Sequence, residues 1–105
     1  MSEDDADWKL KLRYGKTTTP YSHFTLFADG QATQENSDYS IMPGPYIMAL
    51  KVWATDHSEA TNMIIEIGGM LKFRVTGKIE IFTSEPEQPP GDNPSAYGAN
   101  FTAYK

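Results

Sequence analysis

Hydrophobic and polar positions alternate with a period of two over two early segments of the chain. Between residues 8 and 14 each apolar side chain is followed by Lys or Arg, and residues 23–28 alternate again, with Phe24, Leu26 and Ala28 on one side. A period of two is typical of a strand with one buried face. We therefore expect two strands, 8–14 and 23–28, antiparallel to each other across a loop at 15–20.

Two later segments also have the pattern of strands. Residues 46–55 are largely apolar on both faces, as expected of a central strand that is covered on each side. In residues 72–83 the apolar side chains share one parity, so one continuous strand with a bend or bulge at Gly77 is expected. The alternative, a hairpin turning at Thr76-Gly77, would place Glu80 on the buried face opposite Phe73.

Two loop signals separate the second and third strands. Asp29-Gly30 is a two-residue turn signal, so Gln31–Gln34 are expected to fold back as a short strand. The polar segment Glu35–Pro45, which ends in Pro-Gly-Pro, is expected to be a loop.

One helix is predicted over residues 57–68. Asp56 is a suitable N-cap, and Glu59 three residues later completes a capping box. The apolar side chains that follow have helical spacing and form one stripe: Ala60, Met63, Ile64, Ile67 and Leu71. Gly68-Gly69 is expected to end the helix.

The C-terminal segment 85–105 is predicted to be a Pro-rich extended arm. It holds four of the seven prolines, and the aromatic residues Tyr97, Phe101 and Tyr104 follow them. An exposed apolar segment is unfavourable in water, so the arm is expected to dock on its own domain or on a second copy.

Together these elements predict an α+β fold in one domain. Residues 1–7 are expected to be an acidic disordered tail, 8–84 a single α+β domain, and 85–105 the arm. The domain has one mainly antiparallel sheet of about four strands, in the order β-β-β-α-β, with a single helix packed on one face. The connection through the helix is long enough for a parallel crossover, and an antiparallel return is also possible.

Composition and charge limit the classes of function. The 105 residues include no Cys, which excludes disulfides and thiolate metal sites. The longest apolar stretch, 46–50, is too short for a membrane helix, and the acidic N-terminus is unlike a signal peptide, so a cytoplasmic protein without a membrane partner is expected. The net charge of −5 belongs to the ends, since residues 8–84 hold seven acidic and eight basic side chains.

The sequence holds no pattern typical of an enzyme. Asp56-His57-Ser58 resembles a catalytic trio, but three consecutive residues cannot align as nucleophile, base and orienting acid. No metal-ligand spacing and no complete phosphate-binding loop are present. We therefore expect a non-catalytic protein with no cofactor and no metal.

The strongest candidate for a binding surface is the sheet face opposite the helix. If the apolar parity faces the helix, the other parity presents basic and aromatic side chains: Lys9, Lys11, Arg13, Phe27, Lys51, Trp53, Lys72 and Arg74. Basic and aromatic residues on an open sheet can bind single-stranded nucleic acid, although the sequence pI near 4.8 opposes it.

The chain resembles a small bacterial or phage-encoded protein. The expected function is a protein–protein interaction module of the inhibitor, adaptor or accessory type, present as a monomer or weak homodimer. The alternative is single-stranded nucleic-acid binding through the basic and aromatic sheet face.

Overall fold

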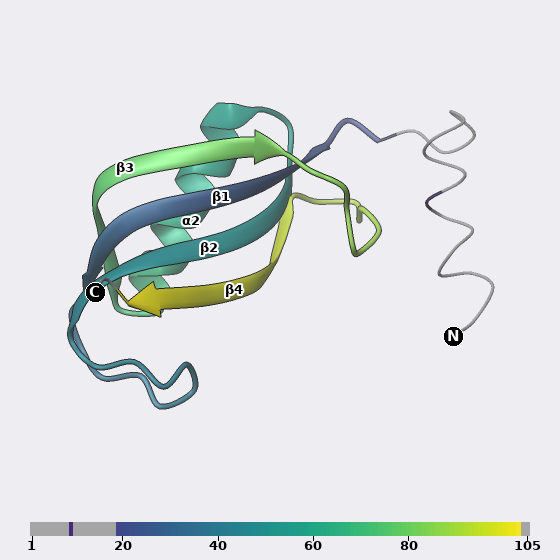
Figure 1. Cartoon of the computed structure of the whole chain (residues 1–105). Coiled ribbons are helices and arrows are strands. Elements are labelled where there is room, and N and C mark those ends of the chain that lie inside the picture. Colours follow the sequence, from purple (N-terminus) through teal and green to yellow (C-terminus); the bar gives the residue numbers. More distant parts are fainter. Residues whose placement is uncertain (1–8, 10–18, 104–105) are drawn as a thin grey trace.

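The computed structural model describes Lys9 and residues 19–103, which form a four-stranded antiparallel sheet with one helix on one face (Figure 1). The prediction of about four mainly antiparallel strands with a single helix on one face is confirmed. The elements are β1 (Ser22–Ala32), β2 (Gly44–Ala54), α2 (His57–Met70), β3 (Phe73–Thr83) and β4 (Ser95–Ala103). Of the predicted strand over 8–14 only Lys9 is described, and it is not in a strand; the rest lies outside the described residues. The fourth described strand is β4 from the C-terminal arm.

The strand order in the sheet is β3-β1-β2-β4. β1 pairs antiparallel with both β2 and β3, so these two strands are parallel to each other on either side of β1. α2 connects them by crossing one face of the sheet (Figure 1). Of the two predicted connections, the parallel crossover is the one observed. β1 lies between the two strands that the crossover joins.

The start of α2 follows the predicted cap. Asp56 Oδ1 accepts a hydrogen bond from the Glu59 backbone N–H at 2.8 Å. The Glu59 carboxylate in turn accepts from the Thr55 backbone N–H at 2.8 Å, one residue before the position expected in a capping box. The first bond satisfies a backbone donor that the first helical turn leaves unpaired, and the second fixes the residue before the cap.

The predicted end of the helix at Gly68-Gly69 is wrong, because α2 continues to Met70. Gly68 is buried, and a Cβ placed on it would lie 3.1 Å from the Phe73 carbonyl oxygen. Close packing of α2 on β3 therefore explains Gly68. The left-handed conformation that ends the helix falls on Lys72, whose φ is 63°.

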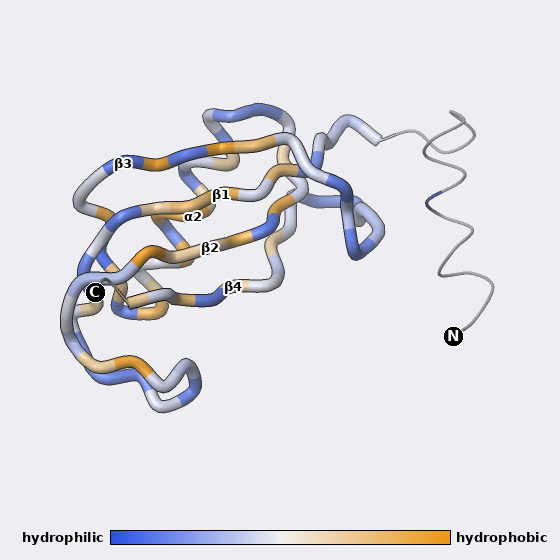
Figure 2. Tube along the Cα trace, viewed as in Figure 1, coloured by the Kyte–Doolittle hydropathy of each residue, from blue (hydrophilic) through white to orange (hydrophobic). Residues whose placement is uncertain are grey.

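The core lies between α2 and the sheet. Leu26 in β1 is fully buried and lies between Leu50 of β2 and Ile81 of β3. Ala60 and Ile64 of the helical stripe are fully buried against it, and Met63, Ile67 and Leu71 pack at its margin. Hydrophobic positions accordingly follow the strands and α2, while the connection between β3 and β4 is mainly hydrophilic (Figure 2).

The predicted turn at Asp29-Gly30 is wrong, because β1 continues through both residues to Ala32. A Cβ on Gly30 would lie 2.3 Å from the Arg74 carbonyl oxygen and 2.6 Å from Cζ of the Phe73 ring. Glycine is needed at position 30 because β3 approaches β1 so closely there. The turn was predicted because glycine is also common in turns.

Both outer strands of the sheet contain irregularities. β3 is continuous, as predicted, and residues 76–78 with Gly77 lie opposite Asp29 alone, which interrupts the β1–β3 register. In β4 the register shifts between the partners of Ala49 and Lys51, next to Gly98 at φ 68°. These are β-bulges, and they lie on the two strands that border the described sheet.

Candidate functional site: the open face of the sheet

The sheet face opposite α2 is built by strand alternation. Because Leu26, Leu50 and Ile81 face the helix, their neighbours along each strand face away from it. The open face is therefore formed by the following side chains: His23, Thr25, Phe27, Asp29, Ile47, Ala49, Lys51, Trp53, Arg74, Glu80, Phe82, Tyr97, Asn100 and Thr102.

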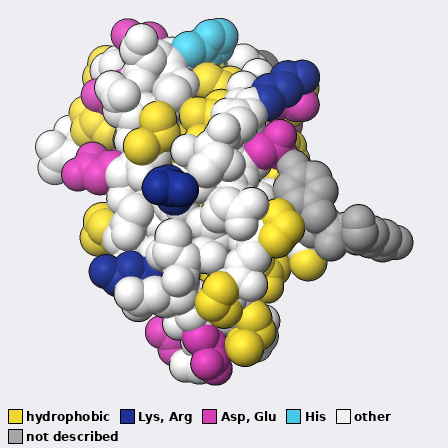
Figure 3. Space-filling model, turned by 90° about the vertical axis from the view of Figure 1, so that its left-hand side faces the viewer, with side chains coloured by type: hydrophobic (Ala, Val, Ile, Leu, Met, Phe, Trp, Pro, Cys, Tyr) yellow, Lys and Arg dark blue, Asp and Glu magenta, His cyan; other side chains and the backbone are white. Residues whose placement is uncertain are grey.

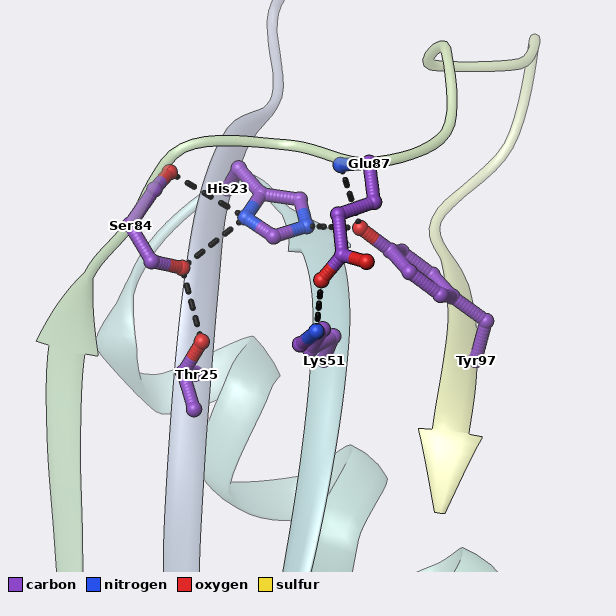
Figure 4. Close-up of polar contacts among 6 residues, drawn as sticks. All are labelled: His23, Thr25, Lys51, Ser84, Glu87 and Tyr97. Atoms are coloured by element: carbon purple, nitrogen blue, oxygen red, sulfur yellow. Dashed lines mark hydrogen bonds and ion pairs between the residues drawn. The ribbon is translucent and has the colours of Figure 1, made fainter.

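A connection between β3 and β4 covers one end of this face. We call residues Ser84–Pro94 the strap. Trp53 Nε1 donates to the Gln88 carbonyl oxygen at 2.9 Å, and the Trp53 side chain is only 4% exposed. The Lys51 ammonium forms an ion pair with the Glu87 carboxylate (Figure 4). The aromatic and basic side chains at this end of the face are therefore bound to the strap.

Both ring nitrogens of His23 form hydrogen bonds, Nδ1 with Ser84 of the strap and Nε2 with Tyr97 of β4 (Figure 4). The Tyr97 hydroxyl accepts from the Glu87 backbone N–H at 2.9 Å, so its own proton is free to be donated to His23 Nε2 at 2.6 Å. Nδ1 then carries the ring proton and faces Ser84, with Oγ at 2.9 Å and the carbonyl oxygen at 3.2 Å. This hydrogen-bond pattern fits a neutral imidazole with its proton on Nδ1.

Burial lowers the pKa of His23 below its ordinary value of 6.5. A hydrogen bond to the Ser84 carbonyl opposes that shift, and the nearby Lys51 charge adds to it. Burial also raises the pKa of Tyr97 above 10.0, against a smaller effect from the backbone at Gln88. Both directions keep His23 and Tyr97 uncharged near neutral pH, in agreement with the hydrogen bonds between them.

Folding stability is expected to fall as the pH drops below about 6.5, the unfolded-state pKa of His. Because the His23 pKa is lowered in the folded chain, the unfolded chain binds more protons at position 23 in that range, and the free energy of unfolding decreases by at most about 1.4 kcal/mol per pH unit. Denaturant unfolding between pH 5 and 8 measures it. His23→Gln should remove this part of the slope, whereas His57→Gln should retain it. Equal slopes for the unaltered chain and His23→Gln would contradict the assignment.

The His23 network does not have the geometry of a catalytic site. Ser84 Oγ accepts from Thr25 Oγ1 at 2.8 Å and also faces the protonated Nδ1, so His23 has no free lone pair with which to activate it. The other ring nitrogen is occupied by Tyr97, and His23 is only 4% exposed. These contacts fix the strap on the sheet and leave no route for a substrate to the imidazole.

Asp56-His57-Ser58 occupies the cap and first turn of α2. The ring of His57 lies edge-on to Phe24, with the ring centroids 5.1 Å apart. Among the described residues, no group of three or more His, Cys, Asp or Glu side chains is placed to hold a metal ion.

The structure places four of the predicted binding residues on the open face: Phe27, Lys51, Trp53 and Arg74. Lys72 was predicted to lie in the strand, but it belongs to the turn between α2 and β3. Its positive φ interrupts the alternation there. It lines a shallow groove of about 370 Å³ with Ile65, Val75 and Arg74. Lys9 is exposed, and Lys11 and Arg13 lie outside the described residues.

The uncovered end of the open face carries an apolar patch. We define the apolar patch as Phe27, Phe82, Ile47 and Ala49. The Phe27 and Phe82 side chains are 39% and 49% exposed, and their ring centroids lie 6.1 Å apart in an edge-on arrangement. Phe82 was not among the predicted residues, although its parity in the 72–83 alternation already placed it opposite the helix.

Charged pairs border the apolar patch. Lys78 Nζ lies 3.2 Å from Glu80 Oε1 on β3, and the Lys51–Glu87 pair lies on the side of the strap. Exposed ion pairs of this kind contribute little to folding stability. They place charged groups of β3 and β2 beside the two exposed aromatic rings.

Comparison with known proteins gave no match, whether to a family model, to a curated protein or to a solved structure. In the part of the chain that the structure describes, no helix is long and apolar enough to cross a membrane. The geometry of the open face is therefore the basis for a functional assignment.

Proposed function

We propose that this protein is a non-catalytic module that binds another protein through the apolar patch on its open sheet face. The observation that carries the proposal is the pair of exposed rings of Phe27 and Phe82, in contact with each other and bordered by charges. Such rings bury a large area on association, and a small group of anchors inside a polar rim is typical of interface centres.

The two edges of the sheet are poorly suited to pairing with a further strand, which favours the open face as the binding surface. β3 has its bulge at Gly77 and β4 has one at Gly98. Bulges and charged side chains on outer strands disfavour the addition of another strand. Recognition by strand addition is thus the less favourable mode for this sheet.

The charge distribution favours a protein partner over single-stranded nucleic acid. Lys51 and Lys78 are each paired with a carboxylate, which weakens their attraction for phosphate. At the end of the molecule drawn in Figure 3, the Lys and Arg side chains stand apart from one another, and one of them lies beside Asp or Glu side chains. A phosphate backbone is normally followed by a continuous basic groove.

Replacing Phe82 with Asp is expected to weaken partner binding by about 30-fold, the usual loss for an interface anchor. Affinity purification from the native host would identify the partner, and titration of the purified pair would measure the dissociation constant. Phe27→Asp should have a similar effect. The matched control is Met70→Asp, because Met70 is 74% exposed on α2, away from the patch.

Full affinity of Phe27→Asp and Phe82→Asp for the partner would contradict the proposed site. Tight binding of single-stranded oligonucleotides that weakens steeply with salt would instead favour the nucleic-acid alternative.

A further inference from the structure

The strap has the composition of a peptide ligand. Ser84–Pro94 contains Pro86, Pro89, Pro90 and Pro94, and it forms no helix or strand. Proline-rich segments keep an extended shape with little loss of chain freedom and present their carbonyl oxygens outward. Proteins recognise such segments with aromatic side chains whose N–H and O–H groups donate to those carbonyls.

The sheet presents this kind of donor to the strap. Trp53 Nε1 of β2 donates to the Gln88 carbonyl oxygen at 2.9 Å, immediately before Pro89. The Tyr21 hydroxyl, just before β1, donates to the Asp92 carbonyl oxygen at 3.0 Å. Two aromatic side chains thus bind two carbonyl groups of the strap.

Further contacts fix the direction and charge of the bound segment. The Tyr97 hydroxyl of β4 accepts from the Glu87 backbone N–H at 2.9 Å, and Lys51 of β2 pairs with the Glu87 carboxylate. His23 orients the Tyr97 hydroxyl through the bond to Nε2 (Figure 4). All the groups on the sheet side come from β1, β2 and β4 or the residue before β1, whereas all the groups on the other side belong to the strap.

We infer that these sheet residues form a binding site for an acidic, proline-rich peptide of another protein, and that the strap occupies the site as an internal ligand. The site comprises Tyr21, His23, Lys51, Trp53 and Tyr97. Most of its contacts are to backbone groups of the strap, which a different proline-rich sequence can supply equally well. The Lys51–Glu87 pair selects an acidic residue two positions before Pro89. The inference does not depend on the apolar patch.

The covalent connection of the strap determines when a peptide can bind. A segment tethered at both ends competes at an effective concentration of about millimolar or more, so an external peptide binds weakly to the intact chain. Weakening the strap should therefore strengthen binding of the peptide. This dependence distinguishes a shared site from a second, unrelated one.

The test uses a synthetic peptide with the sequence of residues 84–94 and a chain whose residues 85–93 are replaced by Gly and Ser in equal number. Trp8→Phe in both chains leaves Trp53 as the sole tryptophan, and its fluorescence reports occupancy. We expect the peptide to bind saturably to the chain with the Gly and Ser replacement. Its affinity for that chain should be at least tenfold higher than for the chain that keeps its strap. A peptide with Gln in place of Glu87 should bind more weakly.

A second variant keeps the strap and so the native connection. Glu87→Gln in the chain removes the ion pair with Lys51 and should tighten binding of the unaltered peptide several-fold, whereas Glu85→Gln should leave it unchanged. Equal affinity of the peptide for all these chains would overturn the inference, and so would no binding by Glu87→Gln at millimolar peptide. The inference would also be overturned if two chains formed a dimer by exchanging their straps and this dimer did not bind the peptide.

Discussion

Replacing Gly30 with Ala is expected to lower the free energy of unfolding by about 3 kcal/mol, the upper part of the usual range for overpacking. The added methyl group would lie 2.3 Å from the Arg74 carbonyl oxygen and 2.6 Å from the Phe73 ring. A ring could turn away, but the carbonyl belongs to a paired strand and can move only with β3. Denaturant unfolding measures the loss.

The matched control for Gly30 is Gly69→Ala on the exposed side of α2. A Cβ at Gly69 meets no atom within 4 Å, so this substitution should raise the free energy of unfolding by about 0.4–1 kcal/mol through the unfolded chain. A Gly30→Ala protein as stable as the unaltered one would show that β1 and β3 can separate at this point. The double variant with Phe73→Leu divides the cost between the ring and the carbonyl.

Deleting residues 95–105 is expected to lower the free energy of unfolding by at least about 3 kcal/mol, the usual cost of removing one large aromatic side chain from a core. The deletion removes Phe101, whose ring contacts those of Tyr39, Tyr46 and Phe73 at centroid distances of 5.3, 6.4 and 5.3 Å. It also removes the hydrogen-bond partners of β2 on the side away from β1. Thermal unfolding and binding of an apolar dye measure the effect.

Phe101→Ala separates the contribution of the ring from that of the strand. We expect this variant to retain the sheet and to lose less stability than the deletion does. If the truncated chain melts at the same temperature as the full chain and binds no more dye, β4 contributes nothing to the folded state, and its aromatic residues are available to another molecule.

The elements that sequence alone predicts well are those whose hydrophobic period is unbroken. The stripe from Ala60 to Leu71 predicts the buried side of α2, and the parity of 72–83 predicts β3 as one strand. The glycines led to wrong predictions of where elements end. Gly30 and Gly68 allow β3 to pack closely against them, and they form neither a turn nor a helix end. A close approach depends on a residue distant in sequence, which no local pattern contains.

The candidate site was predictable only in part for the same reason. Alternation places Phe27 and Trp53 on the open face, and the structure has both there. The same alternation does not show that the strap buries Trp53 while leaving Phe27 and Phe82 exposed. That distinction depends on where a proline-rich connection crosses the sheet, and it is decided by hydrogen bonds such as the one between Trp53 and Gln88.

The central place of β1 also governs the order in which the chain can fold. Its pairing with β2 closes a short connection, whereas its pairing with β3 joins Phe24 to Thr83 across β2 and α2. Long-range pairing carries the larger entropy of loop closure and is the slower step. We therefore expect β1 and β2 to form an early hairpin, and the arrival of β3 on the other side of β1 to set the folding rate, on the order of milliseconds for a mixed domain of this size.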